Sequence, residues 1–177
     1  METEELIVRR FQPEDWQDLY EYLSDEEVVK FEPYGVMTEL ECQRETNRRV
    51  TDPSFWAVYL KNCHKVIGNI YFAKEDFLTW ELGYVFNSHF QGKGFATMAA
   101  HLVIQNQLKQ GDIHRIIAMC DPKNRPSWQL LERIGMRREG HKISNVYFEL
   151  DEKGQPIWKD TYEYGILIRE YTASHSG

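Results

Sequence analysis

Apolar and polar positions along the chain predict strands and helices in a mixed order. Five apolar runs rich in β-branched and aromatic residues have the character of strands, at 6–8, 55–60, 66–72, 78–86 and 113–119. Two further strands are expected near the end of the chain, at 137–149 and 161–169, around a polar turn that contains Gly154 and Pro156.

The first third of the chain carries helical patterns. Residues 13–23 place apolar side chains on one helical face, and Pro13 suits the first turn of such a helix. The residues from Ser24 match a capping box, which predicts a second, short helix that begins there. Thr38 opens another capping box and predicts a helix to about Val50.

Two more helices are expected in the second half. Apolar residues recur three and four positions apart from Phe95, which predicts an amphipathic helix that stops at Gly111. A further helix is expected over 124–134, closed by Gly135.

The order of these elements indicates the fold class. Short turns join the middle strands, whereas helices join the later ones, so the sheet should contain both antiparallel and parallel pairs. No repeat, linker or low-complexity segment interrupts the chain. We therefore expect one α/β (α+β) domain over residues 1–177.

Composition narrows the range of partners. The chain has 177 residues and a net charge of −7, which argues against nucleic acid as a main partner. No apolar run is long enough to span a bilayer, and the acidic start of the sequence is unlike a signal peptide. We expect a cytoplasmic protein without a membrane partner. Three cysteines without metal-ligand spacing should be free thiols, and we expect no metal.

One short loop points to chemistry. The strand that ends at Phe86 is followed by Gln91-Gly92-Lys93-Gly94-Phe95-Ala96, at the expected start of a helix. Helix N-termini attract anions, and glycine lets a ligand approach the backbone closely. The loop could therefore hold a phosphate, although an ordinary strand-to-helix turn would look similar. It matches neither a P-loop nor a dinucleotide-binding fingerprint.

Several ordered motifs resemble the GNAT superfamily of acyl-CoA-dependent N-acetyltransferases. Gln91-x-x-Gly94-x-Ala96 resembles the signature that binds the pyrophosphate of coenzyme A. The strand over 81–86, the segment over 114–140 and the ending over 157–167 resemble other motifs of that family in the same order. The ending is similar to that of the RimJ/RimL branch, which acetylates protein N-termini. The resemblance implies a mixed, mostly antiparallel sheet whose parallel middle strands splay apart.

The resemblance also implies which residues bind acetyl-CoA, the expected cosubstrate. The pantetheine arm should lie beside the strand, and a backbone N–H near Val85 should polarise the thioester carbonyl. The residues expected to contact the cosubstrate are Tyr84, Val85, Phe86, Gln91, Gly92, Lys93, Gly94, Phe95, Ala96, Thr97, Asn124 and Ser127.

Two residues are candidates for proton transfer. Ser127 lies in the family's N-x-x-S motif and could protonate the departing thiolate, although it could instead cap its helix. Glu81 stands in an apolar strand where family members often keep a general base, and a structural or solvent-facing role is equally open. The tyrosine acid of many members does not carry over, because its position holds Leu131.

The sequence thus predicts an acetyl-CoA-dependent N-acetyltransferase that acts on a primary amine by direct attack in a ternary complex. The amine could be a peptide N-terminus or a small molecule. The alternatives are an acyltransferase that uses another acyl-CoA and a CoA-sensing module without turnover. Whether the chain forms a homodimer is left open.

Overall fold

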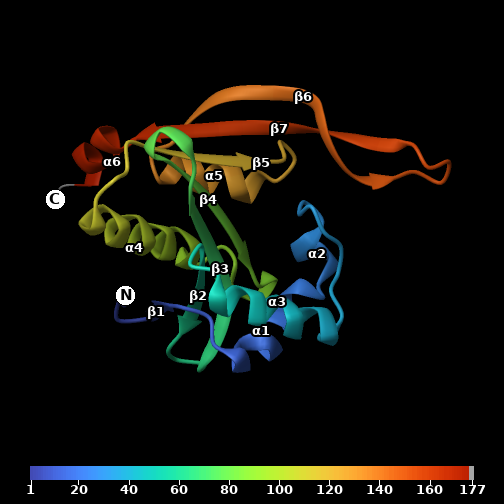
Figure 1. The fold of residues 1–177 in the computed structure, drawn as a ribbon, viewed down its shortest axis with the longest axis horizontal. Helices are drawn as coiled ribbons and strands as arrows, with labels where there is room; N and C mark the ends of the chain where they lie inside the picture. The colour runs from blue at the N-terminus through green and yellow to red at the C-terminus, as the bar shows by residue number, and fades with distance from the viewer. Residues whose placement is uncertain (176–177) are drawn as a thin grey trace.

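The computed structural model describes residues 1–175 and contains a seven-stranded sheet flanked by helices (Figure 1). The strands are β1 (Leu6–Arg9), β2 (Phe55–Leu60), β3 (Lys65–Lys74), β4 (Thr79–Phe86), β5 (Arg115–Cys120), β6 (Arg137–Leu150) and β7 (Pro156–Leu167). Their order across the sheet is β1-β2-β3-β4-β5-β7-β6. Only β4 and β5 pair in parallel within the described residues, so the mixed, mostly antiparallel sheet is confirmed.

Helices cover both faces of this sheet. They are α1 (Trp16–Leu23), α2 (Glu26–Val29), α3 (Glu39–Thr51), α4 (Phe95–Gln110), α5 (Arg125–Arg133) and α6 (Ile168–His175). Strand alternation divides the core between the two faces. Leu82 and Phe86 of β4 pack with α4 and α5, whereas Val85 packs with the apolar residues of α1 to α3.

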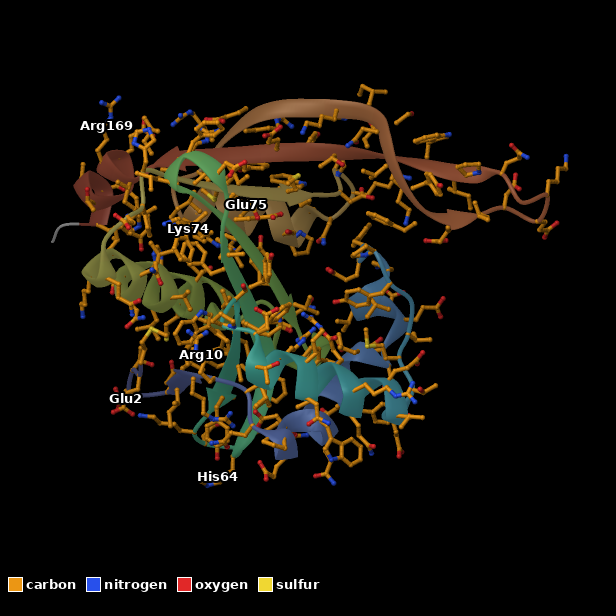
Figure 2. The ribbon with its side chains drawn as sticks, viewed as in Figure 1. Glu2, Arg10, His64, Lys74, Glu75 and Arg169 are labelled. Carbon is orange, nitrogen blue, oxygen red and sulfur yellow. The ribbon has the colours of Figure 1, made fainter. Side chains whose placement is uncertain are left out.

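The parallel strands β4 and β5 separate after a short paired stretch. Only three residues of β4 pair with β5, from Thr79 to Glu81, although β4 continues to Phe86. The paired end lies near Lys74 and Glu75, where β3 turns into β4 (Figure 2). The predicted splay of the two strands is therefore confirmed, and it leaves room between them.

The hairpin of β6 and β7 extends past the rest of the sheet (Figure 1). β7 pairs with β5 only from Tyr162 onward, so its earlier residues pair with β6 alone. An isolated two-stranded ribbon is marginally stable in water. Here an ion pair between Lys159 and Glu149 and an edge-to-face contact of Tyr147 with Trp158 add to the ladder.

Several predicted boundaries are confirmed. Thr38 caps α3 in a full capping box with Glu41, and Asp52 ends that helix. Gly111 ends α4 with a φ of 86°, a left-handed conformation that favours glycine.

The three cysteines are free thiols. No helix among the described residues is long and apolar enough to cross a membrane.

Other boundaries were wrong. The short helix α2 is capped by Asp25, whose side chain accepts from the Glu27 N–H, while Ser24 closes α1 instead. Asp and Ser are comparable N-caps, so the sequence alone does not decide which of these two adjacent residues caps α2. The last strand runs over Pro156–Leu167, and the predicted turn and strand ends shift accordingly.

The final helix α6 was not predicted. It begins at Ile168, directly after β7, and buries Tyr171 against the main core. Its apolar positions are few, and β-propensity alone favours a strand through Arg169. Tertiary packing of Tyr171 decides the conformation here, which a local pattern does not reveal.

Candidate active site

A cleft of about 1530 Å³ opens where β4 and β5 separate. Its walls come from β4, the first turns of α4 and α5, the segment after α2, and the β6–β7 hairpin. Most of the predicted site residues line it: Glu81, Tyr84, Val85, Phe86, Gln91, Gly92, Gly94, Phe95, Ala96, Thr97, Asn124 and Ser127. Lys93 is the predicted residue that does not.

The glycine loop shapes one end of this cleft. Gly94 is the N-cap of α4 with a φ of 82°, and Gly92 has a φ of 74°, so both positions favour glycine. A Cβ at either position would meet no atom within 4 Å. The first helical hydrogen bond joins the Met98 N–H to the Gly94 carbonyl, which leaves earlier N–H groups of the first turn available to a ligand.

Two side chains hold this loop in place. Gln91 donates from Nε2 to the Phe86 carbonyl at 2.9 Å, which ties the loop to the end of β4. Lys93 donates from Nζ to the His89 carbonyl at 3.0 Å, and its ammonium lies 5.3 Å from the centre of the Phe90 ring. Its charge is therefore directed toward the loop and away from the cleft.

The start of α5 forms the opposite side of the splay. Asn124 caps α5, since its Oδ1 accepts from the Ser127 N–H at 3.3 Å. The hydroxyl of Tyr84 reaches from β4 to Ser127, where it donates to the carbonyl oxygen at 2.8 Å. The two hydroxyl oxygens of Tyr84 and Ser127 are 3.0 Å apart. Tyr84 thus connects β4 to the start of α5.

The protonation of this group follows from its burial. Burial raises the pKa of the Tyr84 hydroxyl well above its usual range, so the proton stays on the oxygen. That proton can serve the Ser127 carbonyl, which leaves the Ser127 hydroxyl free to donate elsewhere. Burial also raises the pKa of the neighbouring Cys120 thiol to about 11, against a hydrogen bond with Ser127. Cys120 is therefore a protonated thiol and a poor nucleophile at neutral pH.

Glu81 lies at the last paired position of β4 and β5, opposite Ile117. Its side chain is half-buried and lines the cleft. Burial raises the pKa of this carboxyl group, and the negative charge of Glu75 raises it further. Both effects favour the neutral form, which makes the ionised carboxylate a stronger base.

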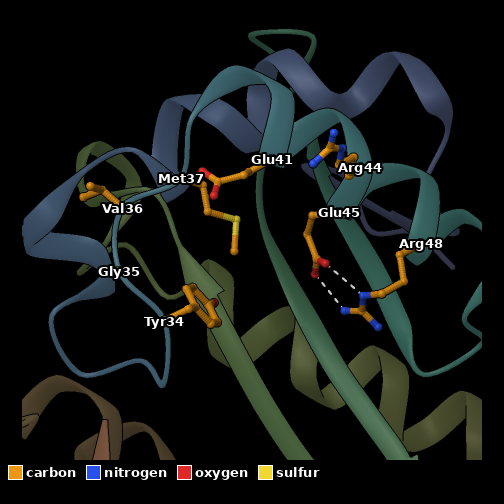
Figure 3. A pocket seen from close by; sticks show the side chains of 8 residues that line it. All are labelled: Tyr34, Gly35, Val36, Met37, Glu41, Arg44, Glu45 and Arg48. Atoms are coloured by element: carbon orange, nitrogen blue, oxygen red, sulfur yellow. Dashed lines mark hydrogen bonds and ion pairs between the residues drawn. The ribbon is translucent and has the colours of Figure 1, made fainter. Parts of the chain in front are cut away.

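A second set of residues lines the cleft on the side of α2 and α3. We call it the acceptor wall, and it consists of Phe31, Glu32, Tyr34, Met37, Phe55, Asn69 and Tyr71. It is mainly aromatic, with one carboxylate. A smaller pocket of about 340 Å³ adjoins it between the segment after α2 and helix α3, where Tyr34 and Met37 face Glu45 and Arg48 (Figure 3).

A buried arginine supports the acceptor wall and itself lines part of the cleft. Arg49 of α3 is only 2% exposed and donates to Glu45 at 2.7 Å and to Asn69 at 2.9 Å. The Asn69 oxygen also accepts from the Tyr22 hydroxyl at 3.0 Å. The guanidinium of Arg49 lies 4.6 Å from the centre of the Phe55 ring. These contacts satisfy a charge that would otherwise be costly to bury.

Sequence reasoning missed the acceptor wall. Its residues come from three separate segments, and none belongs to a recognisable motif. One signal was present, because Glu32 stands between the aromatic residues Phe31 and Tyr34 in a stretch without helical periodicity. Within the described residues no three His, Cys, Asp or Glu side chains gather as a metal site.

Comparison with known proteins places this geometry in a family. Residues 5–137 match the family model described as an acetyltransferase (GNAT) domain. An uncharacterised N-acetyltransferase of Bacillus subtilis (strain 168), YnaD, is 39% identical over 171 residues, with 96% of this chain and 97% of that protein covered. The ribosomal protein uS5-alanine N-acetyltransferase of Escherichia coli (strain K12) is 33% identical over 91 residues, which cover 51% of this chain and 44% of that protein.

Solved structures agree. The crystal structure of a GNAT-family acetyltransferase from Bacillus anthracis superposes with a TM-score of 0.86 and 36% identity, over 96% of this chain and 99% of that chain. A spermidine N-acetyltransferase from Vibrio cholerae, in complex with CoA and spermine, shares the fold with a TM-score of 0.77 at 17% identity, over 96% of this chain and 99% of that chain. The chain therefore belongs to the GNAT family, and it is an acetyltransferase.

Proposed function

We propose that the protein transfers an acetyl group from acetyl-CoA to a primary amine by direct attack within a ternary complex. The cleft between β4 and β5 supports this most strongly, because it joins the glycine loop, the Tyr84–Ser127 pair and the acceptor wall in one space. Residues 1–177 act as a single catalytic domain.

The cosubstrate binds along the splay. The pyrophosphate lies at the start of α4, where the N–H groups of Phe95, Ala96 and Thr97 precede the first helical hydrogen bond. Gly92 and Gly94 leave room for close approach, and no acidic residue stands in that turn to repel the phosphates. The pantetheine arm follows the strand over 84–86 and reaches Asn124.

Ser127 is the proton donor to the departing thiolate. Two contacts support this role: the Tyr84 hydroxyl fixes Ser127, and Asn124 caps the turn that carries it. Glu81 is the general base in the family-based mechanism. Its raised pKa supports that role, since a carboxylate whose pKa is raised accepts a proton more readily than an ordinary one.

The acceptor is a primary amine, either at a protein N-terminus or in a small molecule. Membership in the RimJ/RimL branch, which favours N-termini, is supported by the partial similarity to the uS5-alanine N-acetyltransferase and by the ending Trp158-x-Asp160-x-x-x-Tyr164. Asp160 accepts from Ser144 and His141 in the hairpin, and Tyr164 donates to Glu132. Those partners give the motif a structural role, so it bears on ancestry more than on substrate.

Release of free CoA thiol tests the function. The purified protein is mixed with acetyl-CoA and, in turn, peptide N-termini, polyamines and aminoglycosides. We expect at least one amine to release thiol in step with acetylated product. Binding of acetyl-CoA without thiol release for any amine would support a CoA sensor instead. Faster turnover with a longer acyl-CoA would assign another acyl donor.

A further inference from the structure

The acceptor wall carries a carboxylate that lies outside every motif of the sequence. Glu32 follows α2, and its backbone N–H donates to the Val29 carbonyl at 2.8 Å. This turn holds Glu32 against the end of the helix. Its side chain is half-buried and lines the cleft. The residue therefore has a defined position on the side from which an acceptor would enter.

Glu32 differs from most acidic residues around the cleft in its partners. Three others form ion pairs: Glu27 with Lys30, Glu45 with Arg48 and Arg49, and Asp160 with His141. Within residues 1–175, Glu32 and Glu81 form no salt bridge. The positive charge of Arg49 and the Tyr34 hydroxyl both lower the pKa of Glu32, against the effect of its burial. Arg49 itself is already bonded to Glu45 and Asn69.

The charge of Glu32 also reaches Tyr84, which contacts the proposed proton donor Ser127. Burial raises the pKa of the Tyr84 hydroxyl, and the negative charge of Glu32 adds to that effect. The same hydroxyl contacts Ser127. If the thioester sulfur faces Ser127, the amine would approach the thioester carbon from the acceptor wall, where Glu32 lies. Glu81 is placed differently, at the paired end of β4 and β5 and beside the charge of Glu75.

The charges that face Glu32 set its proton affinity. Burial raises the pKa of Glu32 to about 7, while Arg49 from α3 and the Tyr34 hydroxyl from its own segment oppose this. Tyr84 faces it from β4 as a neutral hydroxyl, and Lys159 lines the cleft from the hairpin. At neutral pH both forms of Glu32 are populated, as suits a group that takes up and releases a proton.

We propose that Glu32 binds the ammonium group of the acceptor and takes its proton, in the role that the family resemblance gives to Glu81. This rests on the proposed acetyl transfer. One proton moves from the ammonium to Glu32, and the nitrogen lone pair forms the C–N bond as the C–S bond breaks. The thiolate takes a proton from Ser127, and water carries the second proton of the nitrogen back to the Ser127 oxygen. The aromatic wall around Glu32 suits an amine with an apolar body.

The test compares Glu32→Gln, Glu32→Asp and Glu81→Gln, with Glu26→Gln as the matched control. Glu26 is an exposed α2 residue outside the cleft, so its variant makes the same charge change without touching the site. We measure kcat/KM for the best amine against pH, and amine binding to the protein saturated with CoA by calorimetry. Acetyl-CoA affinity reports whether each variant is folded.

We expect Glu32→Gln to lower kcat/KM for the amine by about 10²–10⁴-fold at pH 7 and to remove the rise in rate near pH 7. Amine binding should weaken, acetyl-CoA affinity should hold, and Glu32→Asp should recover part of the rate. A Glu32→Gln profile that parallels the wild type, with the loss of rate in Glu81→Gln instead, would overturn the assignment of the base to Glu32. The proposed acetyl transfer would still stand. No thiol release by the wild type with any amine would overturn the acetyl transfer on which it rests.

Discussion

The two sides of the cleft are built by different means. The side of the glycine loop uses backbone groups and caps: Gly94 opens α4, Asn124 caps α5, and Gln91 ties the loop to β4. The acceptor wall uses side chains from the segment after α2 and from β2 and β3, supported by the buried Arg49, which also lines the cleft. Backbone sites can serve one constant ligand across many sequences, whereas side-chain walls can change with each acceptor.

Removal of the Ser127 hydroxyl should have the largest effect on catalysis. Ser127→Ala should lower kcat by about 10²–10⁴-fold, because the lost proton transfer exists mainly in the transition state. Acetyl-CoA affinity should stay close to wild type, as measured by calorimetry. An unchanged kcat would reduce Ser127 to a residue in the first turn of α5 and break the assignment of this side to proton donation.

The acceptor wall should respond to a change of the buried arginine that supports it. Arg49→Met removes a buried charge with two hydrogen bonds, and we expect the free energy of unfolding to fall by about 2–4 kcal/mol, read from chemical denaturation. Acetyl-CoA affinity should hold once the variant is folded, because Arg49 bonds to Glu45 and Asn69 and not to the glycine loop.

Arg48→Met is the matched control for this change. Arg48 is 50% exposed and pairs with the same Glu45, so its loss should cost less than about 1 kcal/mol. Equal losses for the two variants would contradict the claim that burial of Arg49 supports the wall.

The glycine loop should separate binding from stability. Aspartate and asparagine both tolerate the left-handed conformation of Gly94, and both are good helix caps. Gly94→Asp adds a negative charge at the pyrophosphate position, whereas Gly94→Asn has the same size without charge. We expect calorimetry to show CoA affinity at least about tenfold lower for Asp than for Asn, or about 1.4 kcal/mol. Equal affinities would move the phosphate away from this loop.

The same contrast explains how much the sequence predicted. Periodicity and caps predicted the middle strands, α3 and α4, because their apolar faces and terminal residues are local signals. The glycine loop and Ser127 were found through ordered motifs. Glu32 was not, because its significance comes from Tyr34, Arg49 and Tyr84, which meet only in the folded chain.

Lys93 shows the limit of motif reasoning on the better-predicted side. It stands inside the motif, yet its ammonium bonds to the His89 carbonyl outside the cleft lining. A motif fixes where the backbone turns, while a long side chain takes the direction that its neighbours allow. The helix α6 was missed for a related reason, since Tyr171 packs against a core assembled from distant segments.

Tyr84 holds Ser127 in place, and its loss should have a moderate effect. Tyr84→Phe keeps the ring in the cleft and removes the hydroxyl that holds Ser127. The cost of one such hydrogen bond is about 0.5–1.5 kcal/mol, so kcat should fall by roughly tenfold, less than in Ser127→Ala. In the double variant the two effects should not add, because both act through Ser127. Additive losses in steady-state kinetics would give Tyr84 a separate role.

The last prediction concerns stability and pH, and it needs no acyl donor. The pKa of Glu32 is about 7 in the folded protein and near ~4.3 when the chain is unfolded. Between these values the folded state binds a proton that the unfolded state has released, so this group's contribution to stability falls as pH rises. Above pH 7 both states are ionised and the contribution is constant.

Glu32→Gln cannot titrate at this position. We expect its melting temperature to exceed that of the wild type increasingly from pH 5 to pH 7, by a few degrees at roughly 2–4 °C per kcal/mol. Glu26→Gln should follow the wild-type curve, because that side chain is exposed. Parallel wild-type and Glu32→Gln curves in scanning calorimetry would mean that Glu32 titrates as an ordinary surface carboxylate. In that case the acceptor wall would supply no base, and the base would have to come from Glu81 on β4.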